Sequence, residues 1–279
     1  MLPETRLRLA VDLSSPPGDE AVRALLVTWL FARARGGEVL LRLDGDGRAR
    51  PEEIEALFGD LRWLGLDWDE YGRQSSRTGR HRRALERLKR AGRLYSCFES
   101  AEELAALGDT PYDRRALDQT PEEQAGLVAI GMRPHLRFRL NDRPIAWRDL
   151  TGGTCAFAPD ALGDPIVADA EGGPTPVLAA AVDDGEMLTS HILDPDAAAP
   201  GNARKRAIME ALGYRLPELG HLPSRGLAAA SSLGAARRFA DRPRAYLRSL
   251  LGVSPEGRAA DDIEDWIRHF SLTRHAEVA

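Results

Sequence analysis

The chain has 279 residues, of which 43% are hydrophobic and 29% charged, so it is long enough to bury a core and has an ordinary globular composition. Its net charge of −5 argues against binding of nucleic acid by bulk charge, and its two cysteines exclude a disulfide framework or a four-cysteine zinc site. No stretch reaches the roughly 18 apolar residues that a membrane helix needs, and no signal peptide is recognisable. We therefore expect a cytoplasmic protein with no membrane partner.

The first seventy residues alternate between strand and helix patterns. An apolar run at 7–11 predicts a buried strand, and apolar residues spaced three and four apart over 20–35 predict a helix. A second strand is predicted over 38–43, and a second helix follows Pro51. This order favours a parallel α/β sheet.

The remainder of the chain divides into three parts. Short elements and turns fill about 95 to 175, where LRFRL (136–140) and PIAW (144–147) resemble strands of an inserted antiparallel unit. Strand patterns return at VLAAAV (177–182) and HIL (191–193). Further helices are predicted over 81–93, over 203–212 and in the region after about 227.

Six blocks, in one collinear order, resemble the class I glutamyl-tRNA synthetase family. They are WLFARARGGEVLLRLDGDGRARPEEIEALFGDLRWLGLDWDE (Trp29–Glu70), GRLYSCFES (Gly92–Ser100), PYDRRALDQTPEE (Pro111–Glu123), RPHLRFRL, VDDGEMLTSHI and EALGYRLPELGHLP. The resemblance covers nearly all of the chain. It implies an ancestor that activates glutamate with ATP and loads it onto a tRNA 3′ end. The chain ends where that family would begin its anticodon-binding domain, so we expect a truncated relative that lacks this domain.

The resemblance also implies the fold. We expect an α/β protein with a Rossmann-like parallel sheet of the class I synthetase type, an inserted α+β acceptor-binding unit and a C-terminal helical region. The predicted boundaries are 1–94 for the first half of the Rossmann-like domain, 95–174 for the insertion, 175–226 for the second half and 227–279 for a helical stem-contact region.

Two loops that handle phosphate in the family have lost their cations. A His-x-Gly-His turn falls on Gly18, Asp19, Glu20 and Ala21, and a Lys-Leu-Ser-Lys loop falls on Ala228, Ala229, Ala230, Ser231 and Ser232. No lysine follows Lys205. Because carboxylates repel phosphate, we expect these degenerate loops not to stabilise adenylate formation. The alternative is that Asp19 and Glu20 simply favour the start of a helix.

The amino-acid pocket of the family is only partly retained. Arg8 matches an arginine that helps to hold the substrate, and Asp44 stands for a glutamate that faces the substrate ammonium group. Asp194 replaces an arginine, and Pro176 replaces a tyrosine of the pocket wall. We assign no catalytic residue. Asp183-Asp184 is retained, and we expect it to close a strand into a turn.

A zinc knuckle found in some family members is incomplete here. Cys97 and Tyr112 match its pattern, whereas Glu99 and Ala116 stand at two other ligand positions. One cysteine and one tyrosine do not form a tetrahedral site, so we expect no metal and a Cys97 that is a small buried hydrophobe.

Arginines are dense around the predicted helix at 81–93. Candidate RNA contacts are Arg77, Arg80, Arg82, Arg83 and Arg90, and the insertion adds Arg137, Arg139, Arg143 and Arg148. Arginine binds phosphate oxygens well. The alternative is that arginine is merely the default surface charge of this chain.

These observations support one leading hypothesis and two alternatives. The first is a catalytically inactive relative of glutamyl-tRNA synthetase with a binding or regulatory role, whose candidate partners are a tRNA acceptor stem or a protein. The second is a divergent ATP-dependent ligase that transfers an amino acid to tRNA or another acceptor. Only this ligase would need ATP and Mg²⁺, and Asp12, Asp19, Asp44 and Asp46 are its candidate metal ligands. The third is a protein-binding module or a decaying duplicate.

Overall fold

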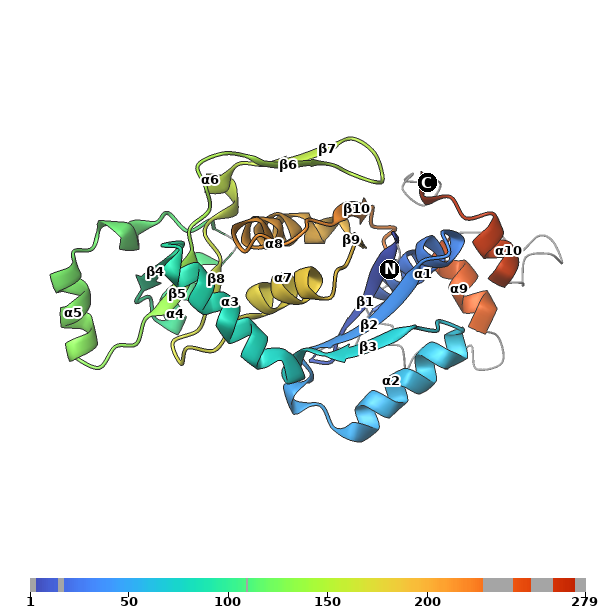
Figure 1. The fold of residues 1–279 in the computed structure, drawn as a ribbon, viewed down its shortest axis with the longest axis horizontal. Coiled ribbons are helices and arrows are strands. Elements are labelled where there is room, and N and C mark those ends of the chain that lie inside the picture. The colour runs from blue at the N-terminus through green and yellow to red at the C-terminus, as the bar shows by residue number, and fades with distance from the viewer. Residues whose placement is uncertain (1–3, 15–17, 109, 228–242, 252–262, 274–279) are drawn as a thin grey trace.

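A parallel sheet of five strands forms the centre of the protein, in the order β10-β9-β1-β2-β3 (Figure 1). The computed structural model describes residues 4–14, 18–108, 110–227, 243–251 and 263–273. The strands are β1 (Arg6–Asp12), β2 (Glu38–Asp44), β3 (Glu70–Arg73), β9 (His191–Pro195) and β10 (Glu218–Leu222). All of their pairings are parallel, which confirms the predicted α/β fold class.

Helices cover both faces of this sheet. They are α1 (Asp19–Ala34), α2 (Pro51–Leu64), α3 (Thr78–Arg90), α7 (Pro176–Glu186), α8 (Ala199–Ala211), α9 (Pro243–Leu251) and α10 (Ile263–Arg268). One core lies between the sheet and α1, α2 and α9, and a second lies around α3, α7 and α8. None of the helices in the described ranges is long and apolar enough to cross a membrane.

Strand β1 presents two different faces because side chains alternate along a strand. Leu7, Leu9 and Val11 belong to the first core, against α1. The opposite face carries Arg6 and Arg8, which bond to residues in or just after α7. The central strand therefore has an apolar face toward α1 and a cationic face toward α7.

The segment VLAAAV at 177–182 is helical, so the predicted strand is wrong. It forms most of α7, which begins with Pro176 at a first-turn position. Leu178, Ala181 and Val182 are all fully buried, because the helix packs against α8 and α3. Burial on several sides removes the polar residues that would reveal a helical period, and the high helix propensity of alanine was the better guide.

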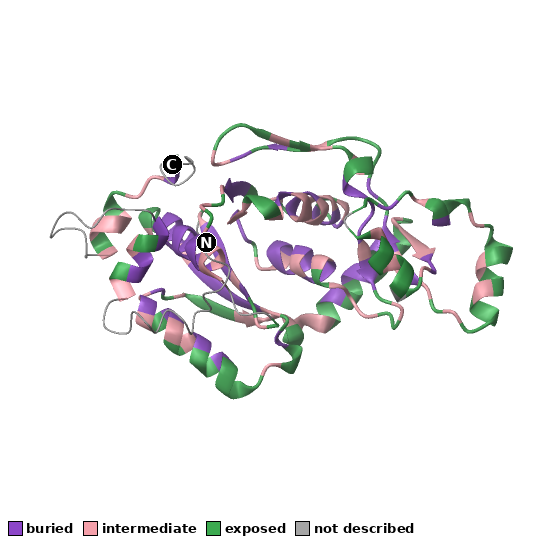
Figure 2. Cartoon of the chain, turned by 180° about the vertical axis from the view of Figure 1, so that it is seen from behind, coloured by how far each residue is buried: buried purple, intermediate pink, exposed green. Residues whose placement is uncertain are grey.

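The insertion consists of short elements, most of which lie at one end of the molecule, while one hairpin extends back along α8 (Figures 1 and 2). It contains β4 (Leu94–Cys97), α4 (Ala101–Leu107), α5 (Pro121–Ala129), β5 (His135–Phe138), β6 (Ile145–Arg148), β7 (Thr154–Phe157), α6 (Pro159–Leu162) and β8 (Ile166–Ala168). Strand β5 pairs antiparallel with β4 and β8, whereas β6 pairs antiparallel with β7. The predicted strands at 136–140 and 144–147 therefore both exist, but they do not pair with each other.

Replacement of Gly185 in α7 by alanine is expected to destabilise the protein by about 1–3 kcal/mol, because overpacking shifts well-packed neighbours. A Cβ at this position would lie 2.5 Å from the ring of Tyr214. Gly126→Ala is the matched control, since a Cβ there meets nothing within 4 Å and α5 should gain about 0.5–1 kcal/mol. Urea unfolding of both variants measures the difference, and equal effects would contradict the packing argument.

Candidate functional site

The sheet order puts the carboxyl ends of β1 and β9 at the position where open α/β sheets have their ligand crevice. The chain builds β2 and β3 on one side of β1 and later adds β9 and β10 on the other, which is the switch point where open α/β sheets bind ligands. Strand β1 pairs with β2 from Arg6↔Glu38 to Asp12↔Asp44, but with β9 only at Leu7↔His191. The two strands therefore separate toward their carboxyl ends.

Two buried arginines converge on Asp184 below this crevice. Arg8 donates from Nε to Asp184 Oδ1 over 2.8 Å, and Arg42 donates from Nη1 to the same oxygen over 2.5 Å. Arg42 also makes a two-point contact with Asp44, over 2.7 and 2.9 Å. Asp184 lies in α7, not in the turn after a strand that the sequence predicts, and its side chain is fully buried.

Asp194 closes the crevice from the side of β9. Its carboxylate accepts from both terminal nitrogens of Arg8, over 3.4 and 3.2 Å, and from Asn202 over 3.2 Å. Lys205 Nζ lies 3.8 Å from the same carboxylate. The neighbouring cavity, lined by Asp184, Asn202 and Lys205 among others, has a volume of about 10 Å³, which is the space of about one water.

We call Arg8, Arg42, Lys205, Asp44, Asp184 and Asp194 the charge cluster. Its three cations and three carboxylates balance one another. Burial alone would raise the pKa of Asp184, but Arg8 and Arg42 overcome this effect and hold it below its usual value. Burial and the nearby Arg8 lower the pKa of Lys205. A ligand carboxylate would enter this cluster without a free cation to receive it.

The degenerate first turn is fastened to the loop after β10. Glu20 Oε1 accepts from the backbone N–H groups of Arg225 and Leu227, over 2.6 and 3.3 Å, and from the Ser224 hydroxyl over 3.1 Å. Arg23 adds a bond from Nη1 to the carbonyl of Pro223, over 2.9 Å. We call these contacts the latch. They connect the start of α1 to residues 223–227.

The four candidate magnesium ligands are each bonded elsewhere. Asp12 and Asp44 lie opposite each other in the β1–β2 register, but Asp44 receives Arg42. Asp19 accepts from the Tyr246 hydroxyl over 2.8 Å, and Asp46 accepts from Arg73 and Ser75. The expected gathering of all four carboxylates thus has no support in these contacts. The second degenerate loop, Ala228 to Ser232, lies outside the described residues.

Glu20→Gln is expected to weaken the latch by about 1 kcal/mol, because it removes the charge from a partly exposed acceptor. Burial raises the pKa of Glu20, but bonds from the Arg225 and Leu227 amides lower it overall. The latch is therefore complete above the usual glutamate pKa of about 4.3 and is lost as the pH falls through the lowered value.

Hydrogen exchange of the Arg225 and Leu227 amides measures this change. The variant should exchange about fivefold faster at neutral pH, since 1–2 kcal/mol is a factor of about 5–30. Glu52→Gln, in the exposed first turn of α2, should leave both rates unchanged. Equal rates in Glu20→Gln and the wild type would show that the latch contributes nothing.

The candidate RNA contacts fall into two groups. Arg77 and Arg80 bond to carboxylates of α7, since Arg77 reaches Asp183 and Glu186 and Arg80 reaches Glu186. Arg82, Arg83 and Arg90 are exposed on α3, and no ion pair joins them to a carboxylate within the described parts of the chain. Of the arginines added by the insertion, Arg137 is buried, Arg143 pairs with Glu210, and Arg139 and Arg148 are exposed.

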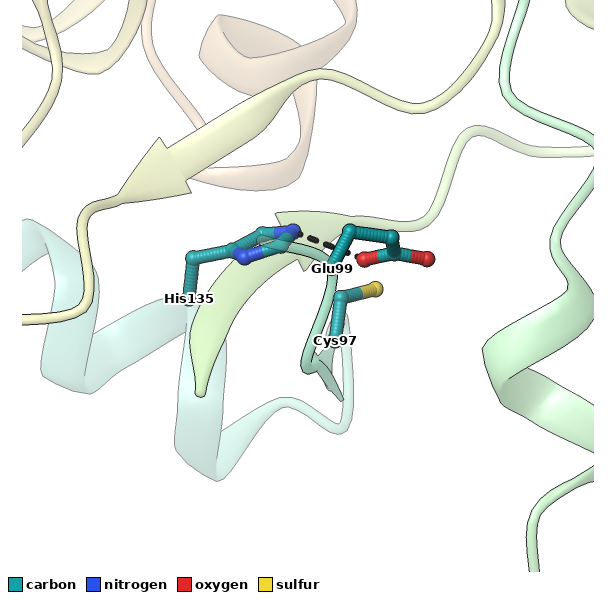
Figure 3. A group of neighbouring side chains, drawn as sticks. All are labelled: Cys97, Glu99 and His135. Atoms are coloured by element: carbon teal, nitrogen blue, oxygen red, sulfur yellow. Dashed lines mark ion pairs between the residues drawn. The ribbon is translucent and has the colours of Figure 1, made fainter. Parts of the chain in front are cut away.

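The structure brings an unexpected histidine to the incomplete knuckle. Figure 3 shows Cys97, Glu99 and His135 pointing toward one another. Cys97 lies directly opposite His135 in the β4–β5 pair, and one donor atom from each of the three residues falls within 4.8 Å of the others. Tyr112 completes the group with a hydroxyl 3.7 Å from Cys97 Sγ and 2.5 Å from Glu99 Oε1. Cys97 is buried, as expected.

Comparison with known proteins connects this architecture to one family. The sequence profile described as tRNA synthetases class I (E and Q), catalytic domain, matches residues 20–233. The chain is 38% identical over 249 residues to a glutamate–tRNA ligase of Azospirillum brasilense, covering 86% of this chain and 55% of that protein. It is 42% identical over 213 residues to glutamate–tRNA ligase 2 of Acidiphilium cryptum, covering 72% of this chain and 48% of that protein.

A solved structure confirms the fold. The crystal structure of a glutamate tRNA ligase from Elizabethkingia meningosepticum superposes with a TM-score of 0.81 at 24% identity, over 99% of this chain and 67% of that one. By sequence, the chain spans about half of the length of the two relatives named above. Because the profile covers most of the sequence, the chain belongs to the family of class I tRNA synthetases for glutamate and glutamine, within its catalytic domain.

Proposed function

We propose that this protein is a catalytically inactive relative of glutamyl-tRNA synthetase that keeps the fold to bind a tRNA acceptor stem. The observation that carries the loss of activity is Asp194. Its carboxylate bonds to Arg8, the residue that the family resemblance assigns to the substrate, and lies beside Lys205. The protein thus supplies from its own chain the negative charge that a substrate carboxylate would bring.

The latch supports the same proposal. Adenylate formation needs donors and cations around a phosphorus centre that gains negative charge. Here the carboxylate of Glu20 lies at the start of α1 and accepts hydrogen bonds from the backbone N–H groups of Arg225 and Leu227. A helix start attracts phosphate through its free N–H groups and its dipole, and an acidic residue at this place offsets both effects.

The exposed arginines of α3 support the binding role. Three of the candidate cations, Arg82, Arg83 and Arg90, have no carboxylate partner among the described residues. They can therefore bind a phosphate group without first breaking an ion pair. Arg139 and Arg148 are further exposed cations in the insertion. Binding by such contacts is electrostatic and independent of base sequence.

ATP–pyrophosphate exchange tests the loss of activity. The purified chain, with glutamate or glutamine and with or without tRNA, should show exchange at background level. The Azospirillum ligase, assayed in parallel, serves as the positive control. Exchange clearly above background would refute the proposal, and a thermal shift with ATP and Mg²⁺ would favour the divergent ligase instead.

Fluorescence anisotropy with a labelled acceptor-stem minihelix tests the binding role. Arg82→Ala combined with Arg83→Ala should weaken binding and reduce the slope of log affinity against log salt by about 1–2, since each lost phosphate contact reduces it by about 1. Arg50→Ala is the control, because Arg50 is an exposed arginine just before α2 that pairs with Glu53. No binding by the wild type would refute the RNA role and leave a protein partner.

A further inference from the structure

A cavity lies between the β6–β7 hairpin and α8. Strands β6 and β7 both contact α8, and the hairpin runs alongside this helix (Figure 1). The cavity has a volume of about 260 Å³, and its lining includes Arg143, Ile145 and Ala146 from the hairpin and Arg206 and Ala207 from α8. Pockets that hold small molecules have volumes of about 300–1,000 Å³, so this cavity suits a ligand at the small end of that range.

Arg206 is the half-buried cation of this cavity, and no described carboxylate lies within ion-pair distance of it. Its one hydrogen bond to a described residue runs from Nη1 to the Pro217 carbonyl over 3.5 Å, which is long for such a bond. Burial lowers the pKa of Arg206, and the charge of Glu210 offsets this effect only in part. The Nε and Nη2 donors are therefore left without a described partner.

Other half-buried arginines of this chain have the partner that Arg206 lacks. Arg33, Arg77 and Arg114 each pair with two carboxylates. Taking a charge out of water without pairing it is costly, so a half-buried guanidinium beside an open cavity favours binding of an anion. That anion would do for Arg206 what two carboxylates do for each of the other three arginines.

The other walls of the cavity indicate what the anion carries. Ile145 and Ala146 on the hairpin, Ala207 on α8 and Leu216 beyond its end present aliphatic side chains. Each CH₂ group that such walls remove from water strengthens binding by about fourfold. A phosphate group has oxygens on every side and would leave these walls in contact with polar atoms. The lining therefore favours an anion with an apolar chain attached.

We propose that this cavity binds a carboxylate carried on a short aliphatic chain, such as hexanoate, with Arg206 as its cation. Arginine presents its N–H groups as a fork that matches the two oxygens of a carboxylate. The chain would lie against Ile145, Ala207 and Leu216. Because none of the arginines to which we assign RNA binding lines this cavity, the site is independent of the proposed function.

Glu210 on the rim of the cavity opposes this ligand. It pairs with Arg143 over 2.5 Å, and the Glu210 side chain is 50% exposed and that of Arg143 65%. Its negative charge repels an incoming carboxylate, whereas a structural role of Arg206 would give Glu210 no influence on any ligand. Glu210→Gln should therefore strengthen binding by up to about fivefold, the size of effect expected for an exposed charge pair.

Titration of the full chain with hexanoate, followed by proton–nitrogen NMR, tests the proposal. The Arg206 Nε–H signal and the backbone amide signals of Ala207 and Glu210 should shift together as hexanoate binds. Hexylamine has a similar chain with the opposite charge and should leave these signals in place. Acetate has the carboxylate without the chain and should bind about a hundredfold more weakly, at about fourfold for each lost CH₂ group. Glutamate would turn its ammonium group and second carboxylate toward the aliphatic walls, so it should not bind.

Three variants separate the cation from the walls. Arg206→Met keeps the aliphatic stem and should weaken binding by about 10–100-fold, the effect of losing a hydrogen bond to a charged group. Ala146→Phe adds bulk at an exposed position of the cavity wall and should weaken binding while Arg206 stays intact. Arg50→Met is the matched control, since Arg50 is exposed just before α2, and should bind as the wild type does. The spectrum of each variant also reports whether it is folded.

A fatty acid and the C-terminus of a protein are the two sources of such a carboxylate, and the same titration distinguishes them. N-acetyl-leucine carries the carboxylate of a C-terminal residue, so tighter binding of this compound favours a protein C-terminus, and tighter binding of hexanoate favours a free acid. No shift of the Arg206 signal with either acid would overturn the proposal. Equal affinity of hexanoate for the wild type and Arg206→Met, or binding of inorganic phosphate as tight as that of hexanoate, would equally contradict it.

Discussion

Asp184→Asn is expected to lower the free energy of unfolding by about 3–5 kcal/mol, because removing one partner of a buried ion pair leaves the other charge uncompensated. Asp184 is fully buried and accepts from both Arg8 and Arg42. Asparagine has nearly the same shape, so the loss comes from charge and not from a cavity. Urea unfolding followed by tryptophan fluorescence measures it.

Asp142→Asn is the matched control for this substitution. Asp142 also pairs with an arginine, Arg114, but its side chain is 74% exposed. Exposed pairs contribute little to stability because solvent screens them, so this variant should unfold close to the wild type. If Asp184→Asn also stayed within 1 kcal/mol of the wild type, the charge cluster would not be the stabilising unit that its burial implies.

The pH dependence of the same variant has a definite sign. The folded-state pKa of Asp184 is lowered by Arg8 and Arg42 against the opposing effect of burial. A lowered pKa contributes stability above the unfolded value of about 3.9, and that stability disappears as the pH falls through the folded value. The difference in free energy of unfolding between the wild type and Asp184→Asn should therefore be constant around neutral pH and should decrease in acid.

The sequence predicts the parallel sheet because its strands and helices follow simple periods. The leucines of β1 and the apolar spacing of α1 indicate buried elements directly. It fails at α7, where burial of Leu178, Ala181 and Val182 makes a helix look like a buried strand. The same error misplaces Asp184. The sequence predicts this partner of Arg8 in a turn, whereas the structure places it on the helix α7.

The sequence predicts single residues of the candidate site but not the contacts between them, because these contacts join distant segments of the chain. Motif comparison identifies Arg8 and Asp194 one at a time, but not that Asp194 bonds to Arg8 across 186 positions of sequence. Lys205 was missed because it lies outside the six blocks, and His135 was missed because the block that contains it, RPHLRFRL, assigns it no role. Their roles depend on strand register and on the packing of α8 against the sheet. Neither of these can be predicted from a local sequence pattern. Pairing LRFRL with the strand containing Cys97 was the one signal that would have found His135.

Asp194→Ala is expected to destabilise the protein by about 3 kcal/mol and, unlike Asp184→Asn, to make its stability depend on added carboxylate. Removal of Asp194 leaves Arg8 and Lys205 with one fewer counterion at the mouth of the crevice. The Asp194 side chain is 17% exposed, so solvent reaches the vacated space. A carboxylate that binds only the folded state stabilises it by about 1.4 kcal/mol at tenfold excess over its Kd.

Thermal unfolding in acetate or glutamate, against sodium chloride at the same ionic strength, measures this rescue. The variant should gain stability from the carboxylates beyond the effect of chloride, and the wild type should not. Such a result would show that Asp194 occupies a carboxylate subsite that still exists beneath it, because the cations that formed the subsite remain in place. Equal responses of variant and wild type would mean instead that Asp194 covers no ligand subsite, and the proposed loss of activity would then rest on the latch alone.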